Sequence, residues 1–168
     1  MNVRLIKAMQ RCCAKADGGH LGQPTLVHGE LCATDKIVAV RYREKEWRRE
    51  EMPRVPWQIW AHEIEGLKPT QEIGVTEKGF RIPGKDSHGY PDEHYPDLVD
   101  TWKWVEKGQD PDYPTRIDPA YAVKVLRVFE AAGAYPTIRN MGNMTTFEGW
   151  CPKTGASIQA LVMGLRDK

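Results

Sequence analysis

Four basic side chains near the start of the chain are spaced as a helix would place them in a single stripe. Arg4, Lys7, Arg11 and Lys15 follow one another at intervals of three, four and four residues, and residues three or four apart are neighbours on a helix surface. Acidic residues are absent from residues 3–16. A row of cations suits contact with a phosphate backbone, whereas most basic stripes are simply a solvated helix face. Both interpretations stay open from the residues alone.

The sequence lacks the motifs of nucleophilic and phosphate-loop enzymes. It contains no G-x-S-x-G elbow, no G-x-x-x-x-G-K-[ST] loop and no G-x-G-x-x-G loop. Lys153-Thr154-Gly155 matches one element of the serine beta-lactamase signature, but the S-x-x-K partner is missing. We therefore expect a protein that is not an enzyme and uses no cofactor.

Two groups of side chains have the chemistry of metal ligands but not the usual spacing. Structural zinc sites show tight pairs such as C-x₂₋₄-C, and neither group contains one. The favoured interpretation is polar loop residues and core thiols, so we expect no metal; a small enzyme using the loop around His88 and His94 is a third class of function. The first group is Cys12, Cys13, His20, His28 and Cys32, and the second is His88, Asp92, His94 and Asp97.

Tryptophan rings are flat and can stack against nucleobases. Four of the six tryptophans are considered for this role. Packing in the core or against loops is the favoured interpretation for them. They are Trp57, Trp60, Trp102 and Trp104.

Composition places the chain among ordinary globular proteins. It has 168 residues, of which 40% are hydrophobic and 28% charged, and a formal net charge of +1. No apolar run approaches the ~20 residues that a membrane span needs, so we expect a cytoplasmic protein with no membrane partner. The length predicts a single domain over residues 1–168. Residues 83–114, rich in Pro, Gly, Asp and Tyr, are the candidate long loop or insertion.

The N-terminal half predicts a helix followed by strands. Residues 3–16 have helical periodicity and precede Asp17-Gly18-Gly19. Residues 24–45 predict a pair of strands joined at Thr34-Asp35, with Val38, Val40 and Tyr42 on one face of the second. Residues 57–67 fit both the alternation of a strand and the spacing of a helix, and the flanking Pro and Gly residues favour a strand. A hairpin is expected with its turn at Lys78-Gly79.

The C-terminal third predicts a short strand at residues 115–118, a helix and three more strands. Asp118 is a good N-cap, Pro119 suits the first helical position, and Gly133 supplies the stop. Lys124 and Arg127 lie away from the predicted apolar face. That face comprises Tyr121, Ala122, Val125, Leu126 and Phe129, and the strands follow around PTIRNM, TTFEGW and ASIQALVMGLR.

The order of several short motifs resembles one domain of the bacterial DNA polymerase sliding clamp, the beta subunit of the replicative polymerase. The chain has a P-x-L entry to a strand, an A-T-D turn in which Lys36 takes the place of the clamp's glycine, a Y-P-D segment and a V-M-x-x-R end. A clamp chain contains three such domains, whereas this chain has the length of one. The matching stretches are Pro24-Thr25-Leu26, Ala33-Thr34-Asp35, Tyr95-Pro96-Asp97-Leu98 and Val162-Met163-Gly164-Leu165-Arg166.

The resemblance implies an α+β fold of the sliding-clamp type, with two helices packed on one side of an antiparallel sheet. It implies that the helices face double-stranded DNA and contact its phosphates without reading sequence, through Arg4, Lys7, Arg11, Lys15, Lys124 and Arg127. It also implies an apolar pocket for partner proteins, such as a DNA polymerase, near the A-T-D turn and the C-terminal strand. By position the pocket residues are Thr34, Val38, Met163, Leu165 and Arg166.

The function implied is a non-enzymatic processivity or partner-recruiting factor in DNA replication or repair. The alternative is a clamp-fold protein-interaction module, of phage or mobile-element origin, that does not encircle DNA; the small net charge favours it. Because one clamp-like domain leaves sheet edges open, we also expect homo-oligomers. The competing expectation is a monomer in which the Pro-rich stretch covers an edge.

Overall fold

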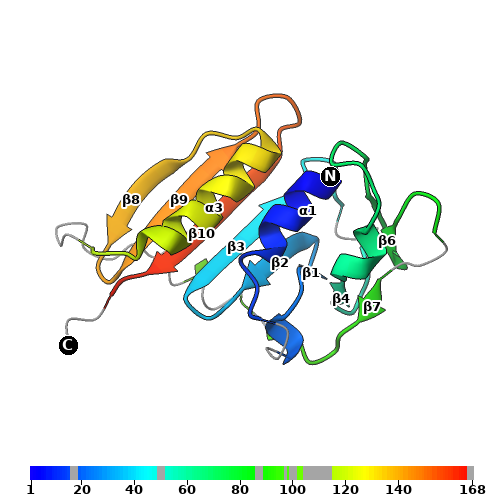
Figure 1. Cartoon of the computed structure of the whole chain (residues 1–168), viewed down its shortest axis with the longest axis horizontal. Coiled ribbons are helices and arrows are strands. Elements are labelled where there is room, and N and C mark those ends of the chain that lie inside the picture. Colours follow the sequence, from blue (N-terminus) through cyan, green and yellow to red (C-terminus); the bar gives the residue numbers. More distant parts are fainter. Residues whose placement is uncertain are drawn as a thin grey trace.

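The protein is an α+β structure in which two helices pack against an eight-stranded antiparallel sheet (Figure 1). The sheet order is β7-β4-β1-β2-β3-β10-β9-β8, and β5 and β6 form a separate two-stranded sheet. The predicted fold class is confirmed at this level. The computed structural model describes residues 1–15, 19–48, 52–85, 89–96, 98, 102–103 and 115–165.

The sheet is built from two similar halves that meet at its centre. In each half a helix precedes a three-stranded antiparallel meander, and the last strands of the two halves, β3 and β10, pair antiparallel with Val40 opposite Ala160. The order β1-β2-β3-β10-β9-β8 therefore has an approximate two-fold axis between β3 and β10. The first half comprises α1 (Val3–Gln10), β1 (Thr25–Val27), β2 (Glu30–Thr34) and β3 (Val38–Arg43); the second comprises α3 (Pro119–Ala132), β8 (Thr137–Met141), β9 (Met144–Trp150) and β10 (Ser157–Met163).

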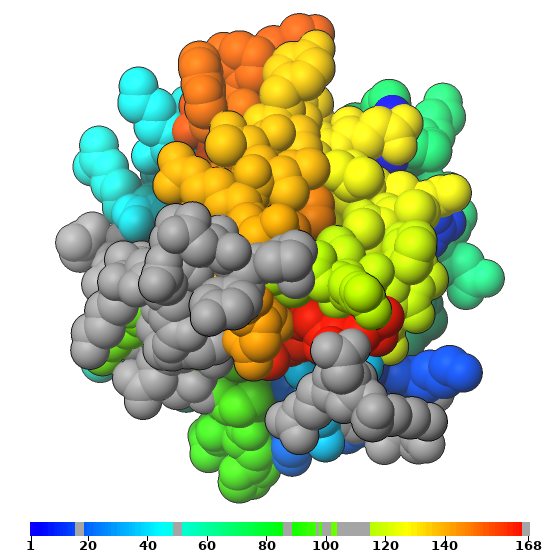
Figure 2. Space-filling view, turned by 90° about the vertical axis from the view of Figure 1, so that its left-hand side faces the viewer, coloured from blue at the N-terminus to red at the C-terminus, as the bar shows by residue number. Residues whose placement is uncertain are grey.

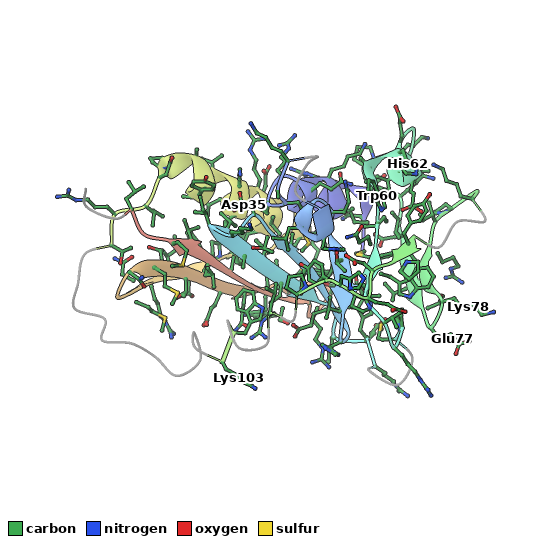
Figure 3. All side chains as sticks on the ribbon, turned by 90° about the horizontal axis from the view of Figure 1, so that it is seen from below. Asp35, Trp60, His62, Glu77, Lys78 and Lys103 are labelled. Atoms are coloured by element: carbon green, nitrogen blue, oxygen red, sulfur yellow. The ribbon has the colours of Figure 1, made fainter. Side chains whose placement is uncertain are left out.

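Short elements at the other end of the sheet extend the first half. β4 (Trp57–Gln58) pairs with β1, and β7 (Tyr90–Pro91) pairs with β4 at the edge. The 3-10 turn η3 (Ala61–Ile64) follows β4, so the strand expected over residues 57–67 is only its first part. The hairpin of β5 (Gly74–Thr76) and β6 (Gly79–Arg81) is present, with Glu77 and Lys78 at its tip (Figure 3).

Both helices cover the same face of the sheet and lie beside each other (Figure 1). The alternation along β3 and β10 turns Val38, Val40, Ile158 and Ala160 toward that side, where they join the main core. Burial of this apolar surface is the main stabilising contribution to the fold. Strands β8 and β9 form the opposite end of the sheet, beside α3 (Figure 2).

The first helix is shorter than predicted. The prediction extended to residue 16, but α1 ends at Gln10. The amides of Arg11, Cys12 and Cys13 bond to carbonyls three residues back, which tightens the chain into a turn. Ala14 N–H then bonds to Leu21 O, so the backbone leaves the helix axis.

Residues 24–34 form two strands where one was expected. The turn between β1 and β2 is at His28-Gly29, whose φ angles are 49° and 80°. Val27 pairs with Glu30 across it, and positive φ at both central residues is typical of a tight two-residue hairpin. The first half is consequently a complete meander.

The second helix begins and ends where the sequence predicts. The Asp118 carboxylate accepts a hydrogen bond from Ala120 N–H at 2.8 Å, and Gly133 closes the helix in the left-handed conformation with φ 68°. The predicted strand over residues 115–118 is not present. The apolar face is rotated from the prediction, because Val128 is fully buried whereas Leu126 is 40% exposed.

Candidate functional site

An ion pair joins the two helices on the layer that the clamp resemblance turns toward DNA. Arg4 Nη2 lies 2.7 Å from Glu130 Oε1 of α3, and both side chains are mostly exposed. Arg4 is therefore partly neutralised within the protein. Lys7 follows it on α1 and is exposed.

Lys124 makes a contact that the sequence did not predict. Its ammonium group donates to Asp35 Oδ2 at 2.9 Å and lies 4.7 Å from the centre of the Tyr121 ring. Asp35 belongs to the turn between β2 and β3, and Figure 3 places it beside α3. Partial burial favours a lower pKa for Lys124, but the Asp35 carboxylate outweighs this and raises its pKa above the ordinary 10.5. Lys124 thus links α3 to the β2–β3 turn of the sheet through an ion pair.

The remaining predicted phosphate contacts are exposed but do not share one helix. Arg11 is the C-cap of α1 and Lys15 lies beyond it, so the predicted stripe is continuous only through Lys7. Arg127 is exposed on α3. Of the six predicted phosphate contacts, four are exposed and take no part in the two ion pairs above: Lys7, Arg11, Lys15 and Arg127.

The opposite face of the sheet changes from polar to apolar along the strands. At one end Arg41 bonds to the Gln159 side chain, and Arg43 lies opposite Ser157. At the other end Ala39 lies opposite Leu161, and Met163 lies opposite Met144. Trp102 packs on this apolar end and is only 3% exposed. A row of apolar side chains therefore follows the ends of β3, β10 and β9.

A hollow of about 560 Å³ opens at this apolar end, which we call the apolar hollow. It contains Thr34, Val38 and Met163, three of the residues expected to contact a partner. Leu165 is 59% exposed and does not line it, and Arg166 lies outside the described residues. The complete lining is Leu21, Thr34, Lys36, Val38, Ala39, Pro96, Leu98, Leu161 and Met163.

The rim of the apolar hollow is held by the turn between β2 and β3. Asp35 Oδ1 accepts hydrogen bonds from the amides of Ile37 and Val38, and Thr34 Oγ1 donates to Val38 O at 2.7 Å. Lys36 has a φ of 76°, a conformation that costs a side-chain-bearing residue about 1 kcal/mol. The position where clamps have glycine is therefore one where glycine would fit without strain.

Sequence reasoning missed several residues of the apolar hollow. Leu161 is two residues before Met163 on β10, and Ala39 lies opposite Leu161, so strand alternation alone places both beside the predicted residues. Pro96 and Leu98, from the stretch expected to be a loop or insertion, also line the hollow. Leu21 comes from the 3-10 turn η1 (Gly19–Leu21), and no local pattern indicates its position.

The two groups of potential metal ligands are mixed in the structure. Asp92 meets His20, from the other group, with Asp92 Oδ1 and His20 Nδ1 2.8 Å apart. His88 and Asp97 lie outside the described residues. Among the described residues no group of three or more His, Cys, Asp or Glu side chains is arranged to hold a metal ion. Burial raises the pKa of the Cys12 thiol to about 12, so it stays protonated at neutral pH.

The four tryptophans considered for stacking, for which packing was the favoured interpretation, are not equivalent. Trp60 is 40% exposed, whereas Trp102 is buried beneath the Arg41 guanidinium, which lies 4.6 Å from the centre of its ring. Trp57 is half-buried, and Trp104 lies outside the described residues. Only Trp60 of this group offers substantial ring surface among the described residues, and Trp150, which the prediction omitted, is 63% exposed.

Comparison with known proteins yields no match among family models, curated proteins or solved structures. Within the described part of the chain, no helix is long and apolar enough to cross a membrane.

Proposed function

We propose that this protein is a clamp-like partner-recruiting factor in DNA replication or repair, and that the apolar hollow receives a short apolar segment of a partner protein. One observation carries the proposal. Thr34 and Val38, at and just after the A-T-D turn, and Met163, near the other end of the chain, were selected only by the positions that the clamp resemblance implies, and they line a single hollow. The symmetric helix-and-meander halves agree with a clamp-like domain.

The lining of the apolar hollow indicates what the partner segment contains. Ala39, Leu161 and Met163 offer apolar surface, which favours bulky aliphatic or aromatic side chains. Lys36 is exposed at the rim and offers a cation. A segment with adjacent leucine and phenylalanine and one nearby carboxylate matches both features.

The experiment is calorimetric titration of the full chain with a short synthetic peptide that has adjacent leucine and phenylalanine and one aspartate. Met163→Glu places a charge in the hollow, and we expect binding to weaken at least about tenfold, which corresponds to about 1.4 kcal/mol. The matched control is Val123→Glu on α3, where an exposed apolar side chain that does not line the hollow is changed. Unchanged binding by a folded Met163→Glu variant would contradict the proposal.

A second candidate function is weak, sequence-independent binding of duplex DNA by the helix layer. It is favoured by α1, which has no acidic residue in its first turn, and by the exposed cations Lys7, Arg11, Lys15 and Arg127. Arg4 and Lys124 contribute less to DNA binding than the resemblance implies, because each has a carboxylate partner. If DNA binding is absent, the protein is the interaction module that does not encircle DNA.

A further inference from the structure

A second hollow, of about 470 Å³, lies at the β4–β7 end of the sheet, and we call it the aromatic hollow. The turn η1 separates it from the apolar hollow, because His20 lines the aromatic hollow whereas the next residue, Leu21, lines the other. Its side chains come from η1, β4, η3 and β7. Those used below are His20, Gln58, Trp60, His62, Tyr90 and Asp92.

The floor of the aromatic hollow is a buried carboxylate that accepts three hydrogen bonds. Asp92 is 8% exposed. Its Oδ1 accepts from His20 Nδ1 at 2.8 Å and from His94 N–H at 3.1 Å, and its Oδ2 accepts from Gln58 Nε2 at 2.7 Å. Burying a carboxylate costs free energy unless it is paired in this way. The three donors are therefore needed to hold Asp92 in the floor of the hollow.

This bonding fixes the orientation of His20. Because Asp92 accepts from Nδ1, the neutral ring carries its proton there and Nε2 has a free lone pair. The His20 side chain is 52% exposed and lines the aromatic hollow. The His94 ring packs against it edge-on, 5.3 Å between centres, and further restrains it. In the neutral ring, His20 Nε2 is therefore a positioned hydrogen-bond acceptor.

The walls of the aromatic hollow are flat rings. Trp60, His62 and Tyr90 contact one another with centres 6.0 to 6.2 Å apart. Trp60 is 40% exposed and Tyr90 47% exposed, although each is held by two ring neighbours. Trp60 and His62 lie together on the segment that follows β4 (Figure 3). Exposed aromatic surface of this kind favours a ligand that stacks.

A second buried carboxylate holds the two walls together. Glu63 is 2% exposed; its Oε2 accepts from Trp60 N–H at 2.8 Å and its Oε1 accepts from Gly89 N–H at 3.1 Å. A Cβ at Gly89 would lie 2.4 Å from Gln58 O, so the two backbones are in direct contact. The aromatic hollow is thus formed before any ligand arrives, and preformed sites lose less entropy on binding.

We propose that the aromatic hollow binds a purine base, with the ring stacked on Trp60 and an N–H at its edge donating to His20 Nε2. The volume is in the range of small-molecule sites and suits a planar bicyclic ring. Lys85 Nζ donates to His62 O at 3.0 Å, which places a cation beside the rim where a phosphate on the ligand would lie.

The test is titration of the full chain with adenosine, followed through the His20 ring protons by NMR. We expect saturable shifts at His20 and at the Trp60 indole. His20→Gln should weaken binding about tenfold, as should replacing adenosine by purine riboside, which lacks the exocyclic amino donor. His28→Gln, an exposed histidine in the β1–β2 turn, is the matched control and should change nothing.

A pair of tryptophan variants controls for misfolding, and a comparison of three ligands identifies the form in which the purine is bound. Trp60→Ala should abolish binding whereas Trp150→Ala, an exposed tryptophan on β9, should leave it intact. Tighter binding of adenosine monophosphate than of adenosine would identify a free nucleotide, and tighter binding of oligo-dA than of either would identify a single strand; both support a purine site. Absence of saturable shifts with all three ligands, or equal affinity for adenosine and purine riboside, would overturn the proposal.

Failure of the purine-binding proposal can be distinguished experimentally from failure of the proposed partner-recruiting function. His20→Gln should leave binding of the leucine–phenylalanine peptide unchanged, and Met163→Glu should leave binding of adenosine unchanged, because the two residues line different hollows.

Discussion

Lys124 Nζ lies 2.9 Å from Asp35 Oδ2, and this ion pair ties α3 of the second half of the chain to the β2–β3 turn of the first half. The Asp35 side chain is 12% exposed and that of Lys124 is 32% exposed. The same carboxylate shapes the turn by accepting the amides of Ile37 and Val38. One aspartate therefore positions both a helix and the rim of the apolar hollow.

We predict that Lys124→Ala lowers the free energy of unfolding by about 1 to 2 kcal/mol, because it leaves a mostly buried carboxylate without its charged partner. Arg127→Ala, on the exposed side of α3, should cost less than about 0.5 kcal/mol. Denaturant unfolding measures both. Because the pKa of Lys124 is raised, its contribution is fully present below the ordinary value of 10.5 and is lost as pH rises through the higher folded-state pKa. A loss near neutral pH would contradict this assignment.

Lys36→Gly should stabilise the protein by roughly 0.5 to 1 kcal/mol. Lys36 has a φ of 76°, where glycine has no steric penalty, although glycine also gains entropy in the unfolded chain. Lys78→Gly, in the β5–β6 turn, is the control; Lys78 is not among the positive-φ residues, so glycine there should be neutral or destabilising. Thermal unfolding of the three proteins distinguishes the effects, and equal changes at both positions would show that backbone strain is not the cause.

Duplex DNA should bind weakly and without sequence preference. If Lys7, Arg11, Lys15 and Arg127 each neutralise one phosphate, the slope of log K against log salt should be about −3 to −4. Arg11→Glu with Lys15→Glu should weaken binding and flatten that slope. Lys78→Glu with Arg81→Glu, on the β5–β6 hairpin outside the two helices, should leave the slope unchanged. Anisotropy titrations at several salt concentrations measure it, and an unaltered slope in the first variant would exclude the helix layer as the DNA surface.

The chain should self-associate through strand β8. At one edge of the eight-stranded sheet β7 contains Pro91, which has no N–H to donate, whereas β8 at the other edge has four exposed residues of five, including Ile138 at 54% exposure (Figure 2). Sedimentation across a concentration range should show mass increasing with concentration. Ile138→Lys should reduce the association, and Val123→Lys, which changes an exposed apolar residue on α3, should not. A constant monomer mass would rule out a clamp-like ring of copies.

Local signals in the sequence were sufficient for the two ends of α3 and for the three strands that follow it, although not for the apolar face of α3. Asp118, Pro119 and Gly133 define α3 through the hydrogen bonds and backbone angles of a few neighbouring residues, and alternation along β10 is a property of any half-buried strand. Position within the clamp-like motifs was enough to select Thr34 and Met163, which line one hollow. These features depend on neighbours in the chain, which the sequence displays directly.

Contacts between distant segments were decided only by the tertiary structure. Lys124 is an outward-facing cation in a helical projection, and its pairing with Asp35 exists because the β2–β3 turn is carried against α3. His20 and Asp92 belong to separate groups in the sequence, and η1 and β7 bring them within 2.8 Å of each other. Such pairs depend on how the sheet is assembled, because a side chain's charge and spacing do not encode which remote residue will lie within hydrogen-bonding distance.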